Sequence, residues 1–295
     1  MLTLANTVLK NRKNAILIAL LFAIIPLMGW VADVIVALVT LRKGAKEGGI
    51  VLTWTMLPSL LLALKGYPHF LLYNALAGSV ITYCFALVLR HTVSWASVLQ
   101  AAVLIGVGEV FALHIIVPNL DAAWSRELLS YFELLRQQLA LQAGSSDMKA
   151  WAELLGRVIT GLQIGLLFIY DIIILLLARI VQARLYNPAG LRPELYNIRL
   201  GNFSILIFFL VMVACLLGNA IALDCLFLTL IPFIVAGISL THYIAAMATV
   251  SSFWFIGFYG LLILFFPYGA VALTVFALAD GVFNIRQRIK AKYQQ

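Results

Sequence analysis

The stretch ITGLQIGLLFIYDIIILLLARI, residues 159–180, decides the fold class of this protein. Its charged residues are Asp171, deep in the run, and Arg179 near its end. A helix needs about 20 apolar residues to cross a bilayer core of about 30 Å, whereas strands of membrane barrels alternate apolar and polar residues over about ten positions. The run therefore predicts a helix that spans a membrane.

Similar apolar runs recur along almost the whole chain. Of its 295 residues, 64% are hydrophobic and only 11% are charged, whereas a soluble domain carries about 25% charged residues. We expect an all-α, polytopic membrane bundle of about eight to ten segments, some of them short hairpins, that forms a single membrane domain over residues 1–295. The runs are 15–26, 29–41, 49–64, 69–89, 93–117, 159–181, 203–223, 226–247, 250–266 and 267–283.

The first two runs are short for membrane-spanning helices. At about 1.5 Å per residue, residues 15–26 cover only about 18 Å. One long kinked helix would put the basic residues at 10–13 and 42–46 on opposite sides, against the positive-inside rule. A hairpin that turns between Pro26 and Trp30 keeps both clusters on one side, so we predict the hairpin.

This topology gathers basic residues on one side of the membrane. Fifteen of the twenty Lys and Arg residues fall there, which predicts cytoplasmic N- and C-termini and a basic cytoplasmic loop at 182–201. The basic residues thus mark topology and do not indicate a nucleic-acid partner. The five on the predicted outer side are Lys65, Arg126, Arg136, Lys149 and Arg157.

The only long stretch outside the apolar runs, residues 118–158, falls on the predicted outer side. Apolar residues recur at helical spacing from Trp124 to Leu139, Gly144 to Ser146 break the pattern, and Asp147 begins a second helix. We predict an extracytoplasmic insertion of two amphipathic helices on the membrane surface. It is either a plain connector or a lid over an outward-facing cavity.

A set of polar side chains falls in the predicted outer half of the membrane or at its outer boundary. Polar groups from different helices that converge would form a solute pocket, but each could instead bond a neighbouring helix. Glu109 is the strongest candidate because Gly106 and Gly108 precede it. The set is Glu109, His114, His69, Asn74, Gln163, Asn219 and Asp224.

Other ionisable residues lie elsewhere in the runs: Asp33, Asp171, His242 and Asp280. Asp171 could pair with a cation such as His242, relay protons, or join helices; we favour the last role. We assign His242, with Tyr243, Trp254 and Tyr259, to an interfacial aromatic belt.

Small residues form a face on the first run, at Ala15, Ala19 and Ala23. Such a face lets helices approach closely, and the neighbour is either internal or a separate subunit. The three cysteines, Cys84, Cys215 and Cys225, lie in or beside apolar runs and are expected to be small buried hydrophobes.

No catalytic motif is present: there is no phosphate-binding glycine loop, nucleophile elbow or paired acidic motif. The four histidines are scattered singly, which argues against a zinc cluster. We therefore expect no enzyme activity, no cofactor and no metal. A lipid-modifying enzyme that uses Asp171, Glu109 or His114 as acid or base is a weaker alternative.

The predicted cytoplasmic loop reads ARIVQARLYNPAGLRPEL over residues 178–195 and IRLG over 198–201, and the chain ends with DGVFNIRQR over 280–288. Together with LRKG at 41–44, these segments resemble the YybS-like bacterial membrane proteins, a family of unknown function. The resemblance covers nearly the whole chain. The distinctive loop positions are Arg184, Tyr186, Asn187, Pro188, Gly190 and Arg192.

That family is distantly similar to the solute-binding S components of energy-coupling-factor vitamin transporters, in which a small-residue face docks the coupling subunit. The resemblance implies a multi-pass protein of the bacterial inner membrane that takes up a small, vitamin-like solute with partner subunits. Extra helices and the outer insertion depart from the S-component pattern, so vitamin-binding residues are not transferred. The alternative is a non-transporting assembly or scaffold protein that acts through helix contacts, with other membrane subunits or as a homo-oligomer.

Overall fold

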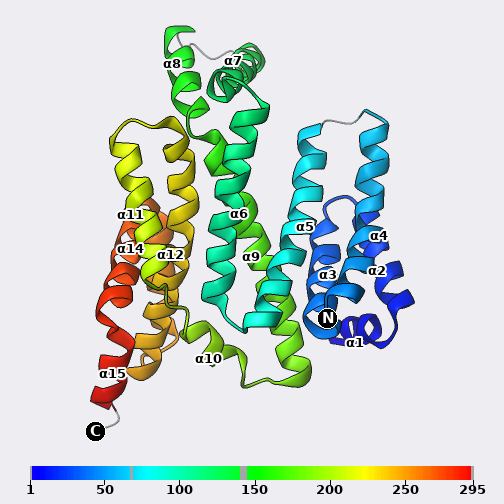
Figure 1. Cartoon of the computed structure of the whole chain (residues 1–295), viewed down its shortest axis with the longest axis vertical. Coiled ribbons are helices and arrows are strands. Elements are labelled where there is room, and N and C mark those ends of the chain that lie inside the picture. The colour runs from blue at the N-terminus through cyan, green and yellow to red at the C-terminus, as the bar shows by residue number, and fades with distance from the viewer. Residues whose placement is uncertain (1, 67–68, 140–144, 294–295) are drawn as a thin grey trace. The chain divides into compact units, whose positions relative to one another are not determined.

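The computed structural model describes residues 2–66, 69–139 and 145–293, and these residues form fifteen helices and no strands (Figure 1). Six helices are long and apolar enough to cross a membrane, and two further apolar helices are shorter. The protein is therefore an all-α, multi-pass membrane protein, as predicted. The six are α4 (Ala45–Leu64), α5 (His69–Thr92), α6 (Trp95–Ile116), α9 (Ile159–Tyr186), α12 (Ala220–Met247) and α14 (Phe266–Phe283); the shorter two are α11 (Asn202–Leu216) and α13 (Phe253–Leu264).

Each of the ten predicted runs matches a helix, but the division between the seventh and the eighth run was misplaced. The run predicted to end at residue 223 ends at Leu216 in the structure. Gly218 has a φ of +80°, and Asn219 accepts a hydrogen bond of 3.0 Å from the backbone N–H of Ala222, so the new helix begins there. Asp224, predicted between two runs, therefore lies inside α12.

The chain forms two compact units. Unit 1 comprises Met1–Ala101 and Leu167–Ile198, and unit 2 comprises Ala102–Leu166 and Arg199–Gln295. The chain passes from one unit to the other within α6, within α9 and after α10 (Leu191–Tyr196).

Unit 1 begins with α1 (Leu2–Lys10) and the short hairpin of α2 (Arg12–Ile24) and α3 (Gly29–Lys43). The predicted hairpin is confirmed, and Leu27 in its turn has a φ of +64°. Helix α2 packs against α3 and α4, with Ala15 and Ala19 buried. Of the two neighbours considered for this small-residue face, the structure therefore favours the internal one.

The loop segment that resembles the bacterial family is held by polar contacts within unit 1. Helix α9 continues to Tyr186, so the predicted loop is helical over its first residues. The guanidinium of Arg179 donates to both carboxylate oxygens of Glu194, and the guanidinium carbon of Arg42 lies 3.9 Å from the centre of the Tyr186 ring. Segments 41–44 and 178–195, which both carry the family resemblance and are distant in sequence, therefore contact each other.

In unit 2, α11, α12 and α14 pack side by side (Figure 1, yellow to orange). Helix α15 (Ile285–Tyr293) follows, and its buried Arg286 forms an ion pair of 2.9 Å with Asp280. Burial lowers the pKa of the Arg286 guanidinium, and the charge of Asp280 opposes that shift. Arg199 donates to the backbone oxygens of Asp280 and Gly281, so the 198–201 and 280–288 segments also contact each other.

The predicted insertion at 118–158 contains two helices, as expected. They are α7 (Leu120–Leu139) and α8 (Ser145–Gly156), which pack side by side in unit 2 (Figure 1, green). Gly144 of the predicted break lies outside the described residues, and Ser145 and Ser146 belong to the first turn of α8.

Candidate metal centre

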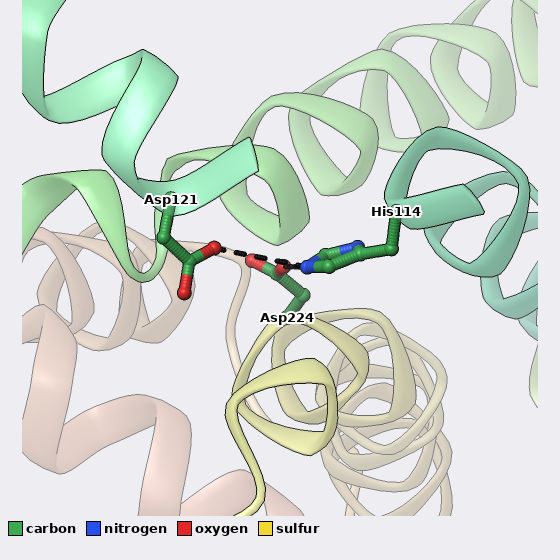
Figure 2. A group of neighbouring side chains, drawn as sticks. All are labelled: His114, Asp121 and Asp224. Carbon is green, nitrogen blue, oxygen red and sulfur yellow. Dashed lines mark ion pairs between the residues drawn. The ribbon is translucent and has the colours of Figure 1, made fainter. Parts of the chain in front are cut away.

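Three side chains from three helices of unit 2 meet at one point (Figure 2). They are His114 near the end of α6, Asp121 in the first turn of α7 and Asp224 in the first turns of α12. The Nε2 atom of His114 lies 3.7 Å from Oδ1 of Asp121 and 3.7 Å from Oδ2 of Asp224. All three potential ligand atoms lie within 4.8 Å of one another.

A tight turn brings the first two of these residues together. Pro118 follows the last turn of α6, and Asn119 has a φ of +56°, a left-handed conformation that asparagine tolerates better than most residues. The chain then enters α7 at Leu120. Asp121 is thereby turned back toward His114, seven residues earlier in the chain.

Glycines bring α9 close to α12 and so fix Asp224. A Cβ added at Gly161 would collide with the backbone of Asp224, and one at Gly165 would lie 3.2 Å from Cδ1 of Ile231. Two glycines four residues apart are a common close-packing face in membrane helices. The backbone N–H of Gly161 also donates a 2.7 Å hydrogen bond to Oδ1 of Asp224, which orients this carboxylate.

The orientation of His114 leaves its Nε2 facing the carboxylates. Its Nδ1 lies 3.0 Å from the backbone oxygen of Val110. Because a carbonyl only accepts, Nδ1 carries the proton, and in the neutral ring Nε2 then presents a lone pair. Nε2 of His114 and Oδ2 of Asp224 are buried and have no hydrogen-bond partner among the described residues.

This arrangement suits a divalent cation. Asp224 is only 1% exposed, and a buried carboxylate without a counter-charge is costly. An imidazole nitrogen with two carboxylate oxygens matches the ligand preferences of Zn²⁺, Mn²⁺, Fe²⁺, Co²⁺ and Ni²⁺, and three protein ligands leave at least one coordination position open. The bonds from Val110 and Gly161 correspond to the outer hydrogen bonds that usually orient metal ligands.

A protonated His114 would also attract the two carboxylates. However, both contacts are 3.7 Å long, beyond the range of about 2.7–3.2 Å for N–H···O hydrogen bonds. A cation between the three groups accounts for both the distances and the unsatisfied atoms.

The structure brings His114 and Asp224 of the predicted outer polar set into direct proximity. Glu109 lies on α6 before His114, Gln163 lies on α9 two residues after Gly161, and Asn219 caps α12. His69 and Asn74 belong to α5, and their side chains lie outside the described residues.

Sequence reasoning missed Asp121, which lies three residues before Trp124, where the predicted surface helix begins. It also searched for clustered histidines and did not consider one histidine with two carboxylates. The turn at Pro118 and Asn119 and the glycine pair at 161 and 165 were the available signals.

The other intramembrane acids have protein partners. Asp171 accepts a 2.8 Å hydrogen bond from Thr82, and Asp33 accepts hydrogen bonds from Ser79 and Tyr170. These interhelical bonds favour the helix-joining role for Asp171.

The predicted aromatic belt is packed together in unit 2. His242 Nε2 lies 2.7 Å from the Tyr259 hydroxyl, and its ring stacks on Phe255 at 4.1 Å between ring centroids.

A pocket of about 990 Å³ between α12, α13 and α14 has a nearly wholly apolar lining, which suits contact with lipid chains better than with a polar solute.

No family model, no curated protein sequence and no solved structure matches the chain. The resemblance to YybS-like proteins and to S components therefore stays a prediction that rests on the sequence segments quoted above.

Proposed function

We propose that this protein is the solute-binding component of an uptake system in a bacterial inner membrane. It would hold its solute on the predicted outer side through a divalent cation bound by His114, Asp121 and Asp224. The observation that carries this proposal is the pair of buried, unsatisfied atoms, Nε2 of His114 and Oδ2 of Asp224, that face each other at 3.7 Å.

The location of the three residues supports a binding role. They lie at the predicted outer ends of α6 and α12 and at the start of α7, where a solute from outside would arrive. A cation with an open coordination position offers an attachment point for an oxygen or nitrogen atom of the solute. Helix packing alone gives no reason to direct three ligand-type atoms at one another.

Metal titration of the purified protein in lipid nanodiscs tests the proposal. Isothermal calorimetry with Mn²⁺, Co²⁺ and Zn²⁺ should show one saturable site for at least one of these ions. His114→Gln and Asp224→Asn should abolish it, whereas Asp147→Asn, at an exposed acid of α8, should leave it intact. Absence of saturable binding, or equal binding by all variants, would overturn the proposal.

Partner subunits are the second element of the proposal. Affinity purification from native membranes should recover a membrane subunit together with ATPases. Because Ala15 and Ala19 are buried by the chain's own helices, Ala19→Leu should disturb folding of unit 1 itself. Recovery of an unrelated complex without ATPases would favour the assembly role over uptake.

A further inference from the structure

A pocket with several charged lining residues adjoins the candidate metal centre. It has a volume of about 430 Å³ and lies between α7 and α8, within the range of about 300–1,000 Å³ typical of small-molecule sites. Its charged lining residues are Asp121, Arg126, Lys149, Glu153 and Arg157. Asp121 belongs both to this pocket and to the metal group, so the two sites share a wall.

The wall next to Asp121 is tightly packed. The Ser125 hydroxyl donates a 2.7 Å hydrogen bond to the backbone oxygen of Asp121. A Cβ added at Gly156 would collide with the Ser125 hydroxyl and would lie 2.8 Å from the same backbone oxygen. The end of α8 is therefore locked against the first turns of α7, and the pocket has a fixed floor beside the metal ligand.

The pocket is lined by three basic and two acidic side chains, so its net charge is positive, and the basic side chains are not neutralised by ion pairs among the described residues. Within the described part of the chain, Arg126, Lys149 and Arg157 form no ion pair. Once a metal ion neutralises Asp121, Glu153 is the one acid among the described lining residues that remains beside these three basic side chains.

Membrane topology does not explain these charges. All three belong to the five basic residues on the predicted outer side, where the positive-inside rule disfavours them. A ligand of opposite charge gives them a role.

We infer that this pocket binds the oxyanion of a small solute, a carboxylate or a phosphate, and that the same oxyanion reaches the cation at Asp121. Arginine guanidinium groups bind both kinds of oxyanion in a bidentate manner, and lysine adds a point charge. The metal part of this inference rests on the proposed function. The solute class is thus an anionic metabolite that binds together with a divalent metal ion.

The test uses inorganic phosphate and citrate as probes, titrated into the full-length protein in nanodiscs of zwitterionic lipid. At least one probe should bind saturably. Arg157→Gln and Arg126→Gln should each weaken it by about 10- to 100-fold, the loss expected for a charge-assisted hydrogen bond. Arg136→Gln, on α7 but outside the pocket lining, is the matched control and should change nothing.

The coupling between the two sites is measured separately. Mn²⁺ should raise the affinity for the probe, and the probe should raise the affinity for Mn²⁺ by the same factor, because linkage between two binding sites is reciprocal. Arg157→Gln should leave the affinity for Mn²⁺ alone unchanged, which separates loss of the anion site from loss of the metal site.

The outcomes distinguish this inference from the proposed function. Intact Mn²⁺ binding without phosphate or citrate binding would overturn the inference and leave the metal site standing. Anion binding that is sensitive to Arg157→Gln but indifferent to Mn²⁺ would overturn the shared coordination. If vesicles with anionic lipid bind through these arginines while both soluble probes fail, the oxyanion belongs to a lipid headgroup and the solute assignment is wrong.

Discussion

Asp33 in unit 1 and Asp224 in unit 2 are both buried carboxylates on apolar helices, yet their surroundings differ. Asp33 has both oxygens satisfied, by the Ser79 hydroxyl at 2.6 Å and the Tyr170 hydroxyl at 2.8 Å. Asp224 has one oxygen bonded to Gly161 and the other opposite His114 without a hydrogen bond. Burial of a carboxylate in a membrane helix therefore does not by itself mark a binding site. Asp224 differs because its unsatisfied oxygen faces a second ligand-type atom, Nε2 of His114, at 3.7 Å.

Asp280 represents a third arrangement. Its carboxylate is neutralised by the buried guanidinium of Arg286, which also contacts the backbone oxygen of Ala236 and the hydroxyl of Ser239. The carboxylate of Asp33 thus accepts hydrogen bonds from hydroxyls, and that of Asp280 pairs with an arginine. In our proposal, that of Asp224 binds a metal ion. Substitutions at each should have effects of different size and kind.

The largest loss of stability is expected for Asp280→Ala. It leaves Arg286 buried without its counter-charge, which typically costs about 3–5 kcal/mol. Denaturant unfolding in detergent measures this loss, with Asp147→Ala as the exposed control. A loss within about 0.5 kcal/mol, the range of ordinary surface substitutions, would show that the ion pair does not hold α15 to the bundle.

Gly161→Ala should have the next largest effect. Its Cβ has no room against the backbone of Asp224, so α9 and α12 must separate at a cost of about 1–3 kcal/mol. Displacement of the carboxylate should also lower metal affinity by about 10- to 100-fold, as for other losses of ligand orientation.

Gly165→Ala is the matched control for that variant. There the nearest atom is the flexible end of Ile231 at 3.2 Å, so both effects should be much smaller. Equal effects of the two alanines on metal affinity would contradict the assigned role of Gly161.

Asp33→Asn should cost about 0.5–1.5 kcal/mol, because one hydroxyl of the pair loses its carboxylate acceptor. Unfolding measurements should detect this loss, and calorimetry should show unchanged metal binding. Loss of metal binding in Asp33→Asn would contradict the assignment of a structural role to Asp33 and a metal-binding role to Asp224.

Asp224→Asn should have the smallest effect on stability when metal is absent. The amide oxygen can still accept from Gly161, and the second position has no hydrogen bond to lose, so the change should stay below about 1 kcal/mol. Unfolding in the presence of a chelator measures it. A loss as large as that of Asp280→Ala would mean that the carboxylate already has a strong partner within the protein.

The apolar runs were sufficient to predict most of the fold. Each apolar run became a helix because membrane helices satisfy their own backbone hydrogen bonds, so the pattern alone determines them. The boundary near residue 223 was wrong because the run there is continuously apolar and only the conformation of Gly218 and the cap at Asn219 divide it.

The candidate site was only partly predictable. His114 and Asp224 stood out as polar residues in apolar runs. Asp121 did not, because its role depends on a turn of a few residues that reverses the chain after His114. The meeting of α6, α7 and α12 also depends on close packing of α9 at Gly161, a tertiary contact that the apolar runs do not encode.

Metal-dependent stabilisation of the wild type and of Asp224→Asn is the strongest test of the metal centre. At a free metal concentration of 100 times the dissociation constant, binding to the folded state should stabilise the wild type by about 2.7 kcal/mol. We expect this gain for the wild type and none for Asp224→Asn at the same concentration. An equal gain in both proteins, or none in either, would contradict the assignment of His114, Asp121 and Asp224 as a metal centre.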